Sequence, residues 1–249
     1  MNKPIVICEE SFQVAWRKVC DELSKTNWEL WDVVVEIGNP LFINMDYDKL
    51  ITEFAKEHSL IKPRDVAYTI FPYGFYYLNR NPEKFYKNYW RFFKHTRKSE
   101  HSGWGTYFER MIRYPWGEQE VDQLGKIIKS IKGSERILRA AYTMIIPKPG
   151  PENTKLRGAP CLNYIAVRTE PSSTGRIINL LAVYRNHDFL ERAYGNYLGL
   201  CKLLEYIVSE TGSNIGKVTC MSSHAFVGKF KTALKDLICN DIQEGVTNE

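Results

Sequence analysis

The segment spanning residues 156–226 constrains the fold more than any other part of the chain. It contains two apolar runs, residues 162–167 and 177–185, separated by the Pro-, Ser- and Gly-containing stretch TEPSSTGR, a pattern typical of a β-hairpin. A polar turn at residues 186–188 follows, and then a mostly apolar stretch predicts a helix that ends before Gly212. We therefore expect a hairpin and a long buried helix at the centre of the molecule.

Outside this segment, helical periodicity and strand-like runs occur in irregular order, which predicts an α+β fold. The length of 249 residues is compatible with one domain, residues 1–249, with a divergent aromatic-rich segment at about 63–105. The further helices expected are 11–25 with Ser11 as N-cap, 46–58 capped by Asp46, one starting at Asn81-Pro82, 121–132 and 230–242. The further strands expected are two short ones within 31–44, one at 136–146 and one at 217–220.

Composition narrows the classes of function. No apolar run approaches the roughly 18 residues that span a membrane, and the net charge of +5 is compatible with an anionic ligand without indicating nucleic acid. Six scattered cysteines with no CxxC pair predict reduced thiols in the cytoplasm, without disulfides or a metal site. The stretch WRFFKHTRK at 90–98 could be a stacking platform for nucleic acid, but we favour an amphipathic helix with a solvated basic face.

Cys161 is the first candidate for chemistry, because it follows Pro160 at the start of the first hairpin strand. A nucleophilic cysteine needs a lowered pKa, usually from nearby cations. Arg157 and Arg185 are the candidate cations, so we expect Cys161 to be partly thiolate at neutral pH. The alternative is a buried cysteine that acts as a small hydrophobic side chain.

Four other polar residues surround the hairpin in the sequence. Arg185 and Asp188 flank the turn after the second strand, where functional groups are common, although a surface ion pair is an equally good interpretation. Asn196 lies in an otherwise apolar helix, and its amide could read the edge of a base, unless it lies on the helix surface. His224 follows a short strand and is either a binding residue or a structural histidine.

Together these residues resemble the thymidylate synthase family, which includes the pyrimidine-nucleotide hydroxymethylases. Each motif is unspecific alone, but several occur in the family's order, which argues against coincidence. The motifs are Val121-Asp122-Gln123-Leu124 followed by IIKSIK, Ser134-Glu135-Arg136-Ile137-Leu138, Pro160-Cys161, Arg185-Asn186-His187-Asp188, Asn196 at the family's spacing from that arginine, and His224-Ala225-Phe226.

The resemblance implies a three-layer α+β sandwich around a bent mixed β-sheet, with two copies joined through that sheet as a homodimer. It implies that Cys161 attacks C6 of a pyrimidine nucleoside monophosphate such as dUMP. C5 can then take a one-carbon unit from 5,10-methylenetetrahydrofolate or a related folate. The other implied roles are phosphate binding by Arg185, phosphate binding in the partner subunit by Arg136, a hydrogen-bond network through Asp188, base recognition by Asn196 and sugar binding by His224.

Departures from the family pattern leave alternatives open. Phe226 replaces the sugar-binding tyrosine, and the catalytic glutamate has no clear match; Glu53 is the first candidate and Asp65 the second, with Tyr107 as a further catalytic residue. Only 25 residues follow His224, so we expect the family's C-terminal tail, which closes over the folate, to be missing. The alternatives to methylation are hydroxymethylation, a non-catalytic nucleotide-binding or regulatory protein and, less favoured, a nucleic-acid-binding module.

Overall fold

The computed structural model describes residues 3–78, 80–96, 103–134, 136–137 and 140–243. Within these residues, a mixed seven-stranded sheet has the order β1-β2-β9-β7-β6-β5, and β8 pairs with β9. The pairs β1/β2, β7/β9 and β8/β9 are parallel, and the others are antiparallel. The strands are β1 (Ile5–Glu9), β2 (Glu29–Ile37), β5 (Tyr142–Ile145), β6 (Leu162–Ser172), β7 (Gly175–Tyr184), β8 (His187–Asp188) and β9 (Asn214–Phe226), with β3 (Tyr114–Trp116) and β4 (Gln119–Val121) forming a separate hairpin.

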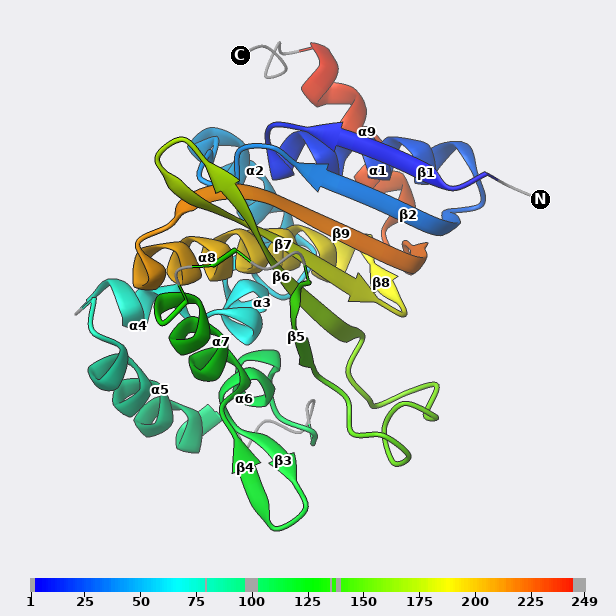
Figure 1. The fold of residues 1–249 in the computed structure, drawn as a ribbon. Coiled ribbons are helices and arrows are strands. Elements are labelled where there is room, and N and C mark those ends of the chain that lie inside the picture. The colour runs from blue at the N-terminus through cyan, green and yellow to red at the C-terminus, as the bar shows by residue number, and fades with distance from the viewer. Residues whose placement is uncertain (1–2, 79, 97–102, 135, 138–139, 244–249) are drawn as a thin grey trace.

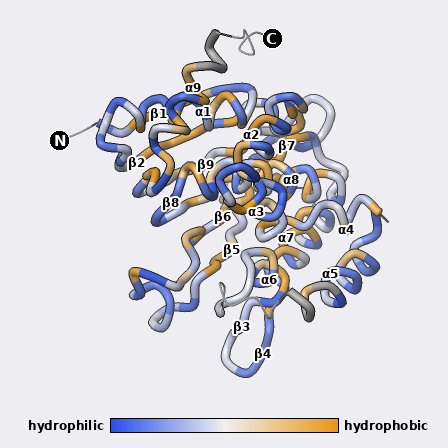
Figure 2. Tube along the Cα trace, turned by 180° about the vertical axis from the view of Figure 1, so that it is seen from behind, coloured by the Kyte–Doolittle hydropathy of each residue, from blue (hydrophilic) through white to orange (hydrophobic). Residues whose placement is uncertain are grey.

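The helices gather on one face of the sheet. Figure 1 shows β2, β9 and β7 in front of α8, and the helices are in front in the reversed view of Figure 2. None of the described helices is both long and apolar enough to cross a membrane. The helices are α1 (Phe12–Lys25), α2 (Met45–Glu57), α3 (Pro63–Ile70), α4 (Tyr73–Tyr77), α5 (Pro82–Thr96), α6 (Tyr107–Ile112), α7 (Gln123–Lys132), the π-helical turn η1 (Phe189–Ala193), α8 (Tyr194–Thr211) and α9 (Lys231–Gln243).

The predicted hairpin and central helix are confirmed, and the prediction of an α+β fold with a mixed sheet holds. The hairpin is longer than expected, because β6 and β7 extend to a tight turn at residues 173–174. Gly212 ends α8 with φ of 64°, a left-handed conformation that glycine adopts without steric cost. Ser11 caps α1 by accepting a hydrogen bond from the Gln13 backbone amide, as expected.

Other expectations were wrong in detail. Residues 41–44 form no strand, since the chain turns after Gly38 toward α2. Asn44, and not Asp46, caps α2 by accepting from the Tyr47 amide. The strand expected at 136–146 is only β5, with residues 135 and 138–139 outside the described part. The short strand expected at 217–220 is the 13-residue β9, which pairs on both sides along the middle of the sheet.

Helix α8 lies between the sheet and α3, which gives three layers. Its side chains are buried around nearly the whole circumference, as expected for a helix packed on two sides. Gly195 and Gly199 face α3 one turn apart, and a Cβ on Gly195 would lie 2.5 Å from the Pro63 carbonyl oxygen. The two helix backbones therefore approach closely only because these positions carry no side chain.

The sheet is irregular along one row of paired residues. Leu162 pairs with Tyr184, Tyr184 with Ser222 and Ser222 with Val33. In a regular strand every second side chain faces the core. At this row three strands depart from that alternation, because two residues that are not buried lie between the buried residues 162 and 165 of β6, 222 and 225 of β9, and 30 and 33 of β2. Asp32 has φ of 54° there. Such bulges bend strands, and Cys161, Arg185 and His224 lie at or just beyond this row.

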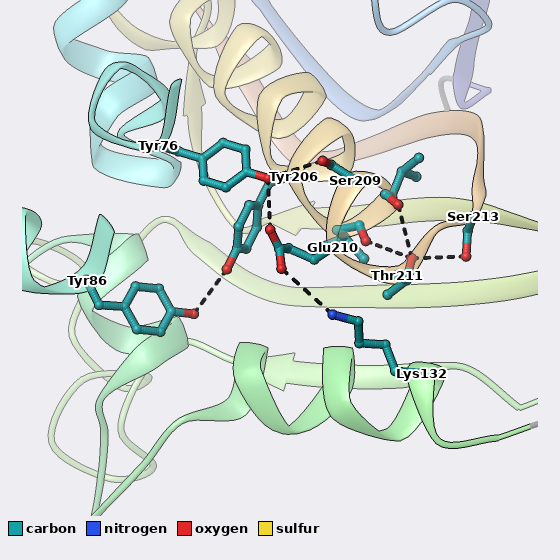
Figure 3. A network of polar contacts seen from close by, with 10 residues as sticks. Tyr76, Tyr86, Lys132, Tyr206, Ser209, Glu210, Thr211 and Ser213 are labelled. Carbon is teal, nitrogen blue, oxygen red and sulfur yellow. Dashed lines mark hydrogen bonds and ion pairs between the residues drawn. The ribbon is translucent and has the colours of Figure 1, made fainter. Parts of the chain in front are cut away.

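A polar network joins the outer helices to the C-terminal half of α8 (Figure 3). The Tyr76 hydroxyl donates to Glu210 over 2.8 Å and lies 3.1 Å from the Ser209 hydroxyl. Lys132 of α7 lies 3.9 Å from the other Glu210 oxygen. Around this network, aromatic rings of α4, α5 and α6 pack on Tyr206 and on one another. The aromatic-rich segment is thus mainly a core-forming element that docks against α8.

Candidate active site

A cavity of about 400 Å³ opens at the end of the central hairpin. This volume is within the range of small-molecule sites. The loop before β6, the turn between β7 and β8, the start of α8, helix α3 and the loop before α6 all contribute to its wall. The lining residues are Ile61, Val66, Thr69, Trp104, Gly105, Thr106, Tyr107, Gly158, Ala159, Cys161, Asn186, His187, Asp188, Arg192, Asn196 and Phe226.

Cys161 lies at the wall of this cavity, half-buried, at the point where β6 begins. Its carbonyl accepts a 2.9 Å hydrogen bond from the Arg185 amide, which closes the end of the hairpin. Burial raises the pKa of the Cys161 thiol above its ordinary value, although a hydrogen bond from the Arg185 side chain and the charge of Arg192 act in the opposite direction. The direction of this shift is opposite to the lowered pKa expected from the sequence, because desolvation outweighs the neighbouring positive charges.

Arg185 lies at the edge of the cavity and not among its lining residues. One guanidinium nitrogen donates to the Lys155 carbonyl, and the side chain also bonds to the Cys161 thiol. Arg185 therefore holds the loop that precedes Cys161 against the end of β7. Arg157, the other expected cation, is exposed on the same loop.

Asp188 lines the cavity and caps the π-helical turn η1. Its Oδ1 accepts from the backbone amides of Leu190 and Glu191 over 3.0 and 2.9 Å. Burial raises the pKa of the Asp188 carboxyl, and these two hydrogen bonds lower it. Among the described residues that line the cavity, Asp188 is the only carboxylate.

Asn196 enters the cavity from the first turns of α8 and is only 3% exposed. Its Nδ2 donates to Nε2 of His187 over 2.9 Å, and Nδ1 of His187 lies 2.9 Å from the Ser222 hydroxyl. The His187 ring stacks on Tyr184 with centroids 4.1 Å apart and planes 4° apart. Burial lowers the pKa of His187 to about 3, so the ring is neutral at physiological pH.

Tyr107 also lines the cavity, at the start of α6. Burial raises the pKa of its hydroxyl, which approaches the backbone amides of Leu162 and Cys161. Trp104 packs against it with ring centroids 5.0 Å apart. Tyr107 and Cys161 are therefore neighbours at the cavity wall.

Four residues expected at the site lie elsewhere. Glu53 is exposed on α2 and lies 3.9 Å from Lys49, and Arg136 is exposed in the loop after α7. Asp65, the second candidate for the glutamate, is exposed on α3. His224 does not line the cavity; its ring stacks on Phe226 and lies 2.6 Å from both the Asn186 and Glu29 side-chain oxygens.

Sequence reasoning missed two residues of the cavity, His187 and Arg192. His187 was visible only as the middle of a polar turn, and its role depends on contacts with α8 and β9. Arg192 is the only lysine or arginine among the described lining residues, and no hydrogen bond or ion pair to a described residue involves its guanidinium. Its charge lowers the pKa of Asp188 and Cys161 in the same cavity, and a positive charge there favours an anionic ligand.

The chain is similar to several curated proteins of methanogenic archaea. A protein named "Putative thymidylate synthase" from Methanothermobacter marburgensis is 27% identical over 226 residues, which cover 90% of this chain and 88% of that protein. Its namesake from Methanothermobacter thermautotrophicus is 26% identical over 87% of this chain and 86% of its own length. One from Methanosarcina mazei is 33% identical over 49% of this chain and 52% of its own length.

No family model matches the chain. The similarity to the two Methanothermobacter proteins nevertheless covers most of this chain and most of each relative. It therefore includes the N-terminal half of this chain, where the motifs are weak. The chain is therefore a divergent relative of proteins named as thymidylate synthases, which confirms the resemblance indicated by its motifs.

Proposed function

We propose that this protein transfers a one-carbon unit to C5 of a pyrimidine nucleoside monophosphate through a covalent adduct with Cys161. The observation that carries the proposal is that Cys161, Asp188 and Asn196, which belong to different elements, line one cavity. The names of the relatives support this class of reaction. Arg192, which makes no hydrogen bond or ion pair with a described residue, supports an anionic substrate.

In the proposed reaction, the Cys161 sulfur forms a bond to C6 of the base. The electron pair of the C5–C6 double bond moves toward the C4 carbonyl, and C5 becomes nucleophilic. After C5 has gained the carbon unit, loss of the C5 proton and of the Cys161 thiolate from C6 restores the double bond. Cys161 must lose its proton first, since the thiolate is the nucleophile. Arg185 donates to the sulfur and favours the anion, so it offsets part of the cost of burial. Asn196 would hydrogen-bond to the base, and Arg185 would bind the phosphate.

The proposed one-carbon donor is 5,10-methylenetetrahydrofolate or a related folate, which supplies the carbon when it is bound. Part of the cavity wall is apolar and includes Ile61, Val66, Trp104 and Phe226. Such a wall fits a flat, largely apolar ring beside the base. The residues present are therefore compatible with a folate, and their part would be to orient its ring and exclude water.

We also propose a homodimer joined through the outward face of the sheet. Val34, Met221 and Val183 form one row of half-buried apolar side chains on β2, β9 and β7, and Figure 1 shows these strands in front of the described helices. In such a dimer the exposed Arg136 would reach the phosphate bound by the other subunit. Sedimentation of the protein and of Met221→Lys tests this, since a charge in that row should yield monomers. A monomeric wild-type protein would contradict the dimer.

The test of the function is thermal stabilisation by dUMP, followed by trapping of the adduct. Arg185→Ala should lose most of the stabilisation, because a guanidinium pairs strongly with phosphate, whereas Cys161→Ser should keep most of it. Arg168→Ala is a matched control, because Arg168 is exposed on the same hairpin and pairs with Glu170. Its response should equal that of the wild type.

Trapping distinguishes an enzyme from a nucleotide-binding protein without turnover. The 5-fluoro analogue of dUMP, added with the folate, should give a covalent adduct at Cys161, because the C5 fluorine is not released. Mass spectrometry of the digested protein identifies the site. Stabilisation by dUMP without an adduct would favour a non-catalytic nucleotide-binding protein, and no stabilisation by any pyrimidine monophosphate would reject the proposed substrate class.

A further inference from the structure

His187, Asn196 and Ser222 form a buried chain of hydrogen bonds behind the cavity. They belong to β8, α8 and β9, and each is at most 3% exposed. The two contacts are both 2.9 Å long. The chain was not expected from the sequence, and the resemblance to thymidylate synthases assigns no role to His187 or Ser222.

The direction of the hydrogen bonds follows from the atoms involved. Nδ2 of Asn196 can only donate, so Nε2 of His187 must accept. A neutral imidazole then carries its proton on Nδ1 and donates to the Ser222 hydroxyl. Ser222 is also hydrogen-bonded to the Cys220 thiol, so its own hydroxyl hydrogen can be donated to that sulfur. If the His187 proton moved to Nε2, the Asn196 amide and the Ser222 hydroxyl would both have to turn.

We propose that His187, held by Ser222, fixes the orientation of the Asn196 amide, so that the cavity selects a base that carries a hydrogen on N3. With Nδ2 directed at His187, Oδ1 of Asn196 bonds to no other described residue, and Asn196 lines the cavity. N3 of uracil carries a hydrogen that Oδ1 can accept, whereas N3 of cytosine is itself an acceptor at neutral pH. The inference rests on the proposed nucleotide site and specifies its base.

The surroundings exclude the doubly protonated His187 ring, and the hydrogen bond of Ser222 to Cys220 favours the tautomer that donates from Nδ1. Tyr184, Tyr197 and Phe189 pack around the ring, and burial raises the pKa of both tyrosines and of Cys220, so none carries a charge. A doubly protonated ring would direct an N–H at the Asn196 amide nitrogen and turn the amide around. Since burial lowers the pKa of His187 to about 3, this does not occur near neutrality.

The experiment measures the dissociation constants of dUMP and dCMP for each variant by calorimetry at one pH and one salt concentration. The two ligands share the sugar and phosphate, so the ratio of their dissociation constants depends on the base alone. An acceptor facing an acceptor in a buried site should cost the wild-type protein roughly 10- to 100-fold in dCMP affinity relative to dUMP. His187→Phe removes the acceptor for Asn196 and should reduce the ratio to roughly threefold or less, because the amide can then turn.

Two further variants separate positioning from general packing. His187→Gln retains an oxygen that can accept from Asn196 and should restore much of the preference. Tyr197→Phe is the matched control, because it alters the same packed cluster but removes a hydroxyl that has no hydrogen-bond partner among the described residues. Its ratio should equal that of the wild type. Ser222→Ala removes the other end of the chain and should lower the ratio by an intermediate amount.

A folded His187→Phe protein with the wild-type preference would overturn the inference and leave the proposed function intact. If His187→Phe does not fold, an unchanged ratio in Ser222→Ala has the same meaning. A wild-type protein that binds neither nucleotide would overturn both the proposed function and the inference. A wild-type protein that binds both equally would overturn the inference alone.

Discussion

Acid should destabilise this protein through His187, in addition to any effect of its carboxylates. The ordinary pKa of histidine is about 6.5, and burial lowers the pKa of His187 to about 3. Between these values the unfolded chain binds a proton that the folded chain does not, so stability falls as the pH falls. The slope is about 1.4 kcal/mol per pH unit, which gives a loss of roughly 2.5 kcal/mol between pH 7.5 and pH 4.5.

Urea unfolding of the wild type and of His187→Gln at these two pH values measures this contribution. His187→Gln replaces the ring with a group that does not titrate, so it should lose roughly 2.5 kcal/mol less than the wild type on acidification. Other groups titrate in both proteins and cancel in the comparison. Burial raises the pKa of the Asp48 and Asp122 carboxyls, for instance, and these contribute with the opposite sign in both. Equal losses in the two proteins would refute the assignment of a buried neutral histidine.

Three further predictions concern packing and the thiol. Gly195→Ala should destabilise the protein by about 1–3 kcal/mol in urea unfolding, because the new Cβ would lie 2.5 Å from a backbone oxygen of α3; wild-type stability would show that the helices can move apart. Tyr76→Phe should cost about 1 kcal/mol by removing the hydroxyl bonded to Glu210, and no change would show that the network in Figure 3 contributes little. A limiting alkylating agent should label exposed Cys8 before Cys161, because Cys161 is half-buried and burial raises its pKa; mass spectrometry that finds Cys161 labelled first would contradict this order.

Elements with a strong local pattern could be predicted from the sequence. The first helix has helical spacing and a serine cap, and the central hairpin has two apolar runs on either side of turn residues. The motif order also led from Cys161 to Asp188 and Asn196, which line one cavity. These successes have one physical cause: helix caps, turns and short-range periodicity depend on neighbouring residues, so they can be recognised within a few positions.

Strand lengths depended on the rest of the fold. A short strand was expected at residues 217–220, and the next six residues contain two serines and a histidine. In the structure β2 and β7 pair along β9 and satisfy its backbone groups. The strand expected at residues 41–44 has no such partner and forms a turn instead. A strand is stabilised by its neighbours, which can be distant in sequence, so pairing decides where it ends.

The chemistry of the site depended on tertiary structure even more strongly. Arg185 flanks Cys161 as the motifs indicated, but how deeply the thiol is buried decides the sign of its pKa shift. His187 acquires its position behind Asn196 only when β8, α8 and β9 pack together. Arg192 faces the cavity because the chain forms a π-helical turn before α8. Desolvation and long-range contacts depend on how the whole molecule packs, so they cannot be predicted from a short stretch of sequence.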